Sequence, residues 1–285
     1  MAQTTTKKKT AKKSAKKSNE PQLKSQTFSQ RLHTMMTVDF RRMFTMPMLY
    51  IMIGIAFVMP ILILVMTTMT AGSTMVDPQT GVETTMEAFT NTWQAIATSS
   101  SDGMAMGMDL TGMCNINLMY FMAGVYVCLF VADDFRSGYA KNLFTVRSKK
   151  TDYVASKTIA CFVGGALMLL AFFVGTVIGG AAAGLPFDLG EAGVSGLVMC
   201  MLAKVFLMAV FVPIFLTMSV IAKQKSWMSI LLSLFAGMLL FMMIPMMSPL
   251  DAGVMNVGLC LVGGAMFSFG LGAVSNLILR KTNLV

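Results

Sequence analysis

Hydrophobic residues along this chain gather in long runs that polar segments separate. A helix needs about 20 apolar residues to cross a hydrocarbon core about 30 Å thick. Six runs approach or exceed that length, at roughly 45–66, 116–132, 158–183, 197–222, 226–247 and 254–279. We therefore predict an all-α polytopic membrane protein with six transmembrane helices. The second run is short, and residues 113–115 are expected to extend it.

The polar segments between these runs differ in charge on the two sides of the membrane. Of the chain's 22 Lys and Arg residues, 21 fall within residues 1–44, 133–157, 223–225 and 280–285. The segments on the other side hold only acidic residues among their charged groups. Positively charged loops stay in the cytoplasm, so both termini and segment 133–157 are predicted to be cytoplasmic.

The N-terminal segment before the first span divides into two parts. Residues 1–26 are rich in Lys, Thr and Ser and predict a disordered basic tail that is attracted to anionic lipid. Nucleic acid is not an expected partner. Residues 27–44 begin with a capping box, Thr27 and Gln30, and predict an amphipathic helix at the membrane interface. Its role is either a membrane anchor or contact with a cytoplasmic partner. Apolar residues recur along it at helical spacing, and those predicted to lie at the interface are Phe28, Leu32, Met36 and Phe40, with Met35 and Met43 in the same pattern.

Segment 133–157 begins with DDFRSGYAKN and forms a cytoplasmic elbow between the second and third runs. Phe135 and Tyr139 are one helical turn apart if the segment is a helix, and Leu143 continues that row. A short helix with an aromatic stripe is typical of a docking element. The alternative is an ordinary basic turn with aromatics at the interface.

The predicted spans contain almost no charged side chains that could take part in catalysis or ion binding. They contain no Asp, Glu or His, and their one ionisable cation is Lys204. Ion-coupled carriers usually place carboxylates inside the membrane, so an ion-driven pump is disfavoured. The chain also lacks the phosphate-binding pattern GxxxxGK[ST]. We expect no enzyme activity, metal site or bound cofactor in this chain, and the energy for any work must come from a cytoplasmic partner.

Lys204 and two stripes of small residues each leave alternatives open. Lys204 either extends to the outer surface or lines a polar cavity on a substrate path, and its position about two turns into the span favours the first. The stripes bring helices close, either within this chain or at a dimer or pore seam. They are Ala171, Gly175, Gly179 and Ala183 on the third span, and Gly264, Ser268, Gly272 and Asn276 on the sixth.

The segment VADDFRSGYAKNLFTVRSKKTDYVASKTIA resembles the region between the second and third helices of ABC-2-type permeases, the membrane subunits of ABC transporters. The matching pattern is made by Asp134, Arg136, Ser137, Gly138, Lys141, Asn142, Leu143, Arg147, Tyr153, Val154, Ser156 and Lys157. The resemblance implies that residues 133–150 contain a coupling helix that fits a groove on a separate ATPase subunit. It also implies that residues 27–44 form a connecting helix beside it.

The same resemblance implies the composition of the working unit. Two ABC ATPase subunits would bind ATP and Mg²⁺, and this chain would pair with a second permease chain, identical or different. The residues expected to couple to the partner are Asp133, Asp134, Phe135, Arg136, Gly138, Tyr139, Lys141, Asn142, Leu143 and Arg147.

The outer loop at 67–115 is the longest segment between spans, and it resembles that of bacterial bacteriocin- and lantibiotic-export permeases. This implies an exporter in the bacterial plasma membrane for an amphiphilic peptide, drug or lipid. Within the loop, a small helical cap is expected to carry Phe89, Trp93 and Ile96 on one face. An ATPase-independent channel or scaffold is the alternative. A copper-related ABC permease is a third hypothesis, because residues 104–113 are rich in Met.

Overall fold

The computed structural model describes residues 27–72, 74–76, 83–85, 89–97, 115–146, 149–222, 225–241 and 243–281. The basic tail at 1–26, the Met-rich residues 104–113 and Arg147 lie outside the described residues. All long elements within the described ranges are α-helices. The predicted all-α membrane class is therefore confirmed.

Five helices are long and apolar enough to cross a membrane. They are α2 (Pro47–Met69), α4 (Leu118–Arg136), α6 (Lys150–Ala183), α7 (Gly193–Ala222) and α10 (Val254–Lys281). The fifth predicted span, 226–247, contains α8 (Ser226–Phe241) and the short α9 (Met243–Met247). At 1.5 Å per residue α8 is about 24 Å long, which is shorter than a hydrocarbon core of about 30 Å.

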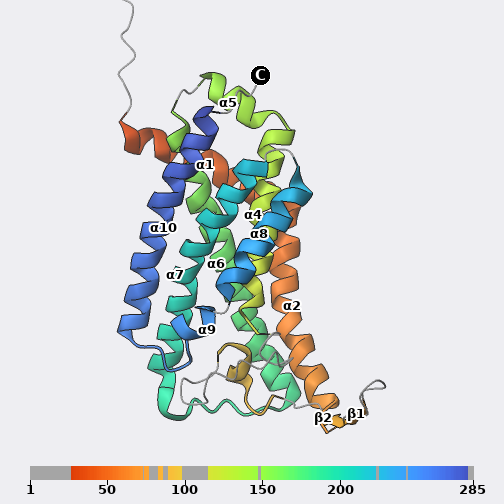
Figure 1. The fold of residues 1–285 in the computed structure, drawn as a ribbon. Coiled ribbons are helices and arrows are strands. Elements are labelled where there is room, and N and C mark those ends of the chain that lie inside the picture. The colour runs from red at the N-terminus through yellow and green to blue at the C-terminus, as the bar shows by residue number, and fades with distance from the viewer. Residues whose placement is uncertain are drawn as a thin grey trace, which may run out of the picture.

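Short elements mark the two ends of the bundle. Figure 1 places α1 (Phe28–Thr45), α5 (Tyr139–Val146) and the C-terminal end of α10 at one end. The hairpin of β1 (Thr74–Val76) and β2 (Glu83–Thr85) lies at the other end, with the 3₁₀ helix η1 (Thr92–Ala95). We call the first the cytoplasmic end, because the Lys and Arg residues concentrate there, and the second the outer end.

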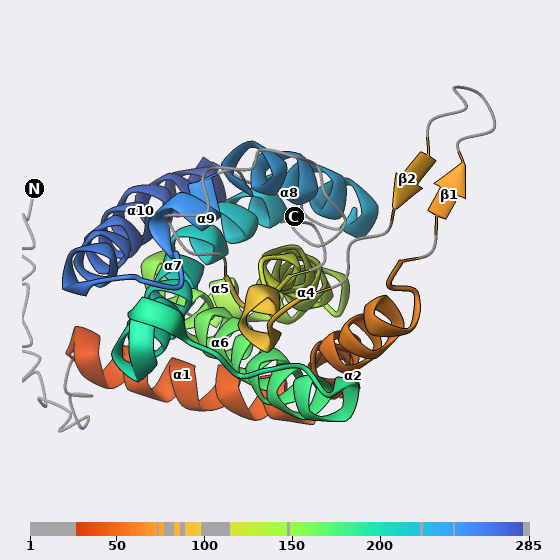
Figure 2. The ribbon, with the colours of Figure 1, turned by 90° about the horizontal axis from the view of Figure 1, so that it is seen from below.

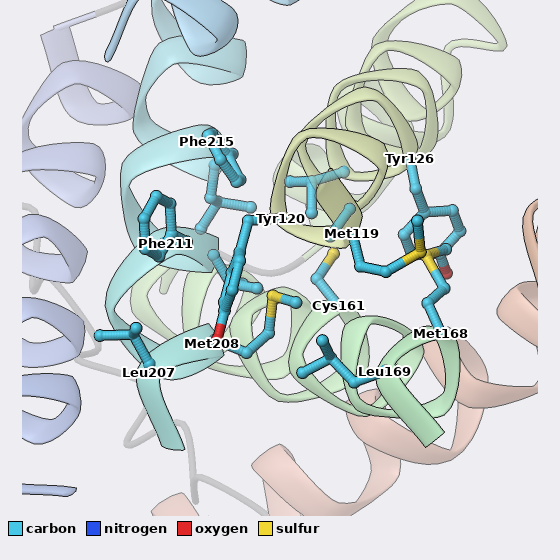
Figure 3. Close-up of a cluster of buried hydrophobic side chains, with 14 of the residues drawn as sticks. Met119, Tyr120, Tyr126, Cys161, Met168, Leu169, Leu207, Met208, Phe211 and Phe215 are labelled. Atoms are coloured by element: carbon cyan, nitrogen blue, oxygen red, sulfur yellow. The ribbon is translucent and has the colours of Figure 1, made fainter. Parts of the chain in front are cut away.

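The three inner helices α4, α6 and α7 form the centre of the bundle. Figure 2 shows α1 and α2 on one side of them and α8 and α10 on the other. Buried apolar side chains fill the space between the inner helices, as Figure 3 shows for Met119, Tyr120, Met168 and Phe211. The rings of Tyr120 on α4 and Phe211 on α7 lie 4.8 Å apart between centroids. This core holds the helices that carry the polar groups described below.

Both small-residue stripes pack against helices of the same chain. A Cβ atom on Gly175 of α6 would lie 2.2 Å from the carbonyl oxygen of Phe57 on α2. A Cβ atom on Gly264 of α10 would lie 2.8 Å from the Cβ of Ala209 on α7. Only glycine fits where two backbones approach this closely. The interpretation as packing within the chain is confirmed at these two glycines.

The outer segment differs from the predicted helical cap. Its described parts are the β1–β2 hairpin, in which Thr74 pairs with Thr85, and the single turn η1. The helical part of the described outer segment is a single 3₁₀ turn, which Asn91 caps and which ends at Ala95. Phe89, Trp93 and Ile96 are nevertheless all buried, as expected for residues that share one face. The segment therefore rests on the bundle through these three side chains.

Candidate coupling site

The cytoplasmic elbow contains two helices separated by a tight turn. α4 ends at Arg136, and α5 begins at Tyr139. Gly138 lies between them with a φ of 75°, a left-handed conformation that glycine adopts without strain. Phe135 and Tyr139 therefore belong to different helices, and the predicted continuous aromatic stripe is wrong. Phe135 is also buried, with 6% of its area exposed, so it cannot be a surface docking residue.

Helix α5 presents one polar face to the cytoplasm. Lys141, Asn142 and Thr145 are exposed, and Arg136 is exposed just before the turn. Leu143 and Phe144 are half-buried and pack against the core. Among the described residues that were predicted to couple to a partner, Arg136, Lys141 and Asn142 are exposed, and the side chain of Asp133 is partly exposed.

Two aromatic contacts attach α5 to the rest of the bundle. The guanidinium carbon of Arg42, from α1, lies 4.1 Å from the centre of the Tyr139 ring. At the other end of α5, the ring of Phe144 meets that of Tyr153 edge to face, with centroids 5.3 Å apart. Cation–π and aromatic contacts of this kind add stabilisation beyond the burial of apolar area. Helix α5 is thus held by α1 at its start and by α6 at its end.

The buried carboxylate of Asp134, on α4, contacts both Arg42 and Tyr153, the two residues to which α5 is attached. It has no exposed area and forms an ion pair with Arg42. The hydroxyl of Tyr153 donates a hydrogen bond to its Oδ2 atom at 2.8 Å. The ammonium of Lys157, also fully buried, lies 2.8 Å from the same oxygen. Asp134 is therefore bound from α1 and from α6 at once.

The same network extends to a second buried carboxylate on α1. Lys157 lies 3.1 Å from Oδ1 of Asp39, and the hydroxyl of Ser156 donates to the other oxygen of Asp39. Arg42 also pairs with the partly exposed Asp133 at 3.2 Å. We call Asp39, Arg42, Asp133, Asp134 and Lys157 the charge cluster. It binds three helices together where they meet the cytoplasm.

The electrostatics of α1 follow from this burial. Burial raises the pKa of Asp39 above its ordinary value, and the nearby Lys157 and Ser156 only partly offset the effect. Burial alone would lower the pKa of Arg42, but Asp134, Tyr139 and Asp133 outweigh it, so that the pKa is raised. Arg42 therefore stays cationic throughout the physiological range.

The structure shows which residues of α1 pack against the bundle. The capping box of Thr27 and Gln30 is confirmed. The buried residues of the helix, however, are Met35, Asp39 and Met43, four residues apart. Phe28 is 51% exposed, and Leu32, Met36 and Phe40 are only half-buried. The helix turns its charged stripe to the protein, because the cluster supplies partners there, and leaves apolar side chains at the bundle surface.

Lys204 forms a second polar centre, near the outer end. Its side chain has no exposed area, so the prediction that it extends to the outer surface is wrong. Its ammonium donates to the side-chain oxygen of Asn117 at 3.1 Å and to the hydroxyl of Ser248 at 3.0 Å. The hydroxyl of Tyr120 donates to the Lys204 carbonyl at 2.8 Å. The lysine thereby connects α7 to the start of α4 and to the residue that follows α9.

The comparisons with known proteins give one match. The sequence profile described as ABC-2 family transporter protein matches residues 45–240. This chain belongs to the ABC-2 transporter family. It is thus a multi-pass membrane permease component of an ABC transporter, in a family whose members associate with an ATPase subunit and are not themselves catalytic. Neither a curated protein nor a solved structure matches the chain.

The matched range covers α5 and most of the charge cluster but not all of it. It includes Asp133, Asp134 and Lys157, whereas Asp39 and Arg42 of α1 precede it. The ABC-2 profile therefore contains only part of the cluster, and the interface helix completes it. Among the described residues, no group of three or more His, Cys, Asp or Glu side chains could hold a metal ion.

Proposed function

We propose that this ABC-2 permease forms the translocation path of a bacterial exporter and is driven by ATP hydrolysis on a separate ATPase subunit. The observation that carries the proposal is α5, a short helix at the cytoplasmic end with an exposed polar face and a buried apolar one. The ATPase docks on Lys141, Asn142 and Thr145. Family membership decides against the ATPase-independent channel or scaffold.

The working unit contains two ATPase subunits and two permease chains, identical or different. ATP and Mg²⁺ bind to the ATPase chains. The substrate is an amphiphilic peptide, drug or lipid, because the predicted spans contain almost no charged side chains. The hypothesis that the substrates are bacteriocin-like rests on the resemblance of the long outer loop to that of bacteriocin-export permeases. The copper hypothesis depends on residues 104–113, which lie outside the described residues.

Copurification from native membranes tests the docking surface. Affinity-tagged wild-type permease should retain a chain with the GxxxxGK[ST] pattern, identified by mass spectrometry, and the purified complex should hydrolyse ATP. The double variant Lys141→Glu with Asn142→Ala should lower the retained ATPase at least about tenfold, because the reversed charge faces the partner. Truncating Phe135 would not test docking, since it is buried.

Lys225→Glu is the matched control. Lys225 is an exposed basic residue on a different cytoplasmic turn, between α7 and α8. This variant should retain the ATPase as the wild type does. Full retention by the α5 double variant would contradict docking at α5. Absence of any ATPase from the wild-type preparation would contradict the proposed function itself.

A further inference from the structure

The attachments of the coupling helix converge on a single side chain. α5 contacts Arg42 through Tyr139 and Tyr153 through Phe144. Arg42 and Tyr153 come from different helices, α1 and α6, yet both bind Asp134. A displacement of α5 therefore acts on the surroundings of one buried carboxylate from two directions.

Asp134 is also placed to pass such a displacement along α6. Its ion pair with Lys157 lies near the start of this 34-residue helix, which is about 51 Å long at 1.5 Å per residue. Near its outer end, Gly180 contacts Thr92 of η1 so closely that an added Cβ would lie 2.3 Å from the threonine side chain. One rigid helix thus connects the charge cluster with the outer segment.

The composition of the charge cluster allows Asp134 to be neutralised by substitution without leaving a buried cation unpaired. The cluster holds three carboxylates, on Asp39, Asp133 and Asp134, and two cations, on Arg42 and Lys157. Replacing Asp134 by Asn leaves two charges of each sign. The amide oxygen keeps an acceptor for the Tyr153 hydroxyl. Because no buried cation is left without an opposite charge nearby, this variant is expected to fold.

We propose that Asp134 is a positioning residue for transport, through which movement of the coupling helix is transmitted to α6 and to η1 at the outer end. This inference rests on the proposed function, since it assumes that a partner moves α5. The physical requirement is a stiff connection between the two ends, and the buried ion pairs of Asp134 supply it at the cytoplasmic end. Coupling through a packed network of this kind needs a direct measurement of the movement.

The experiment measures movement at both ends without needing the substrate. Spin labels are placed on exposed positions of the complex in nanodiscs, in a Cys114→Ser background, since the other four cysteines are buried. One pair, Ser137→Cys with Lys225→Cys, reports the cytoplasmic end, because Ser137 is exposed beside the start of α5 and is not one of the proposed docking residues. The other pair, Thr90→Cys with Val254→Cys, reports the outer end. Distances are compared without nucleotide and with ATP plus vanadate.

Three chains are compared. In the wild type both distances should shift with ATP and vanadate. In Asp134→Asn both nucleotide-free distances should match the wild type and the cytoplasmic shift should remain, whereas the outer shift should be lost. Asp152→Asn is the matched control, because it removes another ion pair between α1 and α6, the 2.8 Å contact with Arg31, outside the charge cluster. It should behave as the wild type.

Any other result of this experiment contradicts either the role of Asp134 or the proposed function. An outer shift in Asp134→Asn equal to that of the wild type contradicts the transmission role alone. Altered nucleotide-free distances in this variant, or loss of both shifts, show that Asp134 serves the fold or the docking of α5, and also contradict the role. If the wild-type complex shows no shift with ATP and vanadate, the proposed function fails first and the inference with it.

Discussion

The two ends of this permease each bury a lysine, and they surround it with different groups. Lys157 at the cytoplasmic end lies between the carboxylates of Asp39 and Asp134, at 3.1 and 2.8 Å. Lys204 near the outer end meets only neutral oxygens among the contacts described, those of Asn117 and Ser248. The cytoplasmic end is therefore organised by opposite charges from several helices, and the outer end by neutral hydrogen bonds and close packing.

This difference determines how strongly the stability of the protein depends on the lysine at each end. Removing one member of a buried ion pair leaves an uncompensated charge, which is strongly destabilising. Removing a charge that has only neutral partners also removes the cost of burying it, so the two effects oppose each other. The same substitution should therefore have unequal consequences at the two ends.

The largest effect is expected for Lys157→Met. The substitution leaves three carboxylates of the charge cluster with Arg42 as the only cation among its members. We expect the free energy of unfolding to fall by about 3–5 kcal/mol, as for a broken buried pair. SDS-induced unfolding in mixed micelles measures the change. Adding Asp39→Asn should recover part of the loss, and a single variant as stable as the wild type would contradict the role of charge pairing.

Much of the fold could be predicted from the sequence, because long apolar runs and the distribution of Lys and Arg depend on local composition. The ends of α4 and α6 could not. Hydropathy placed the boundaries at residues 132 and 158, whereas the helices continue to Arg136 and begin at Lys150. The extensions hold Asp134 and Lys157, whose burial depends on the opposite charges that the charge cluster places beside each of them.

The candidate site was predicted in its position but not in its geometry. Segment 133–157 does contain the short cytoplasmic helix, yet Phe135 and Tyr139 do not share a stripe. Gly138 after Arg136 and Ser137 was an available signal, since glycine commonly ends a helix. The burial of Asp39 had only a weak signal, its spacing of four residues from Met35 and Met43. Its partners Ser156 and Lys157 lie far along the chain, and no local pattern reveals them.

An intermediate effect is expected at the outer end for Gly180→Ala. The new Cβ would lie 2.3 Å from Cγ2 and Oγ1 of Thr92, which is fully buried and has a stiff β-branched side chain. Because η1 must move to admit the methyl group, the free energy of unfolding should fall by about 1–3 kcal/mol. The same SDS titration measures it.

Gly258→Ala is the control for this substitution. Gly258 lies within α10, and an added Cβ there meets nothing within 4 Å. Alanine favours a helix over glycine by about 1 kcal/mol, so this variant should be as stable as the wild type or slightly more stable. Equal effects of the two variants would show that the η1 contact does not constrain the outer end.

The smallest effect is expected for Lys204→Met, the same substitution as at Lys157 but at the outer end. It removes a fully buried ammonium whose described side-chain partners, Asn117 and Ser248, are both neutral. Both lose the lysine as a donor, but Ser248 keeps its hydrogen bond to the Ile244 carbonyl, so only the Asn117 oxygen is left without a described partner. The cost of that lost bond and the relief of a buried charge should nearly cancel, leaving a change within about 1 kcal/mol. The SDS midpoints of the two Lys→Met variants, measured side by side, provide the comparison. A loss at Lys204 as large as that at Lys157 would mean that the outer lysine is also held by an opposite charge, and the contrast between the two ends would then disappear.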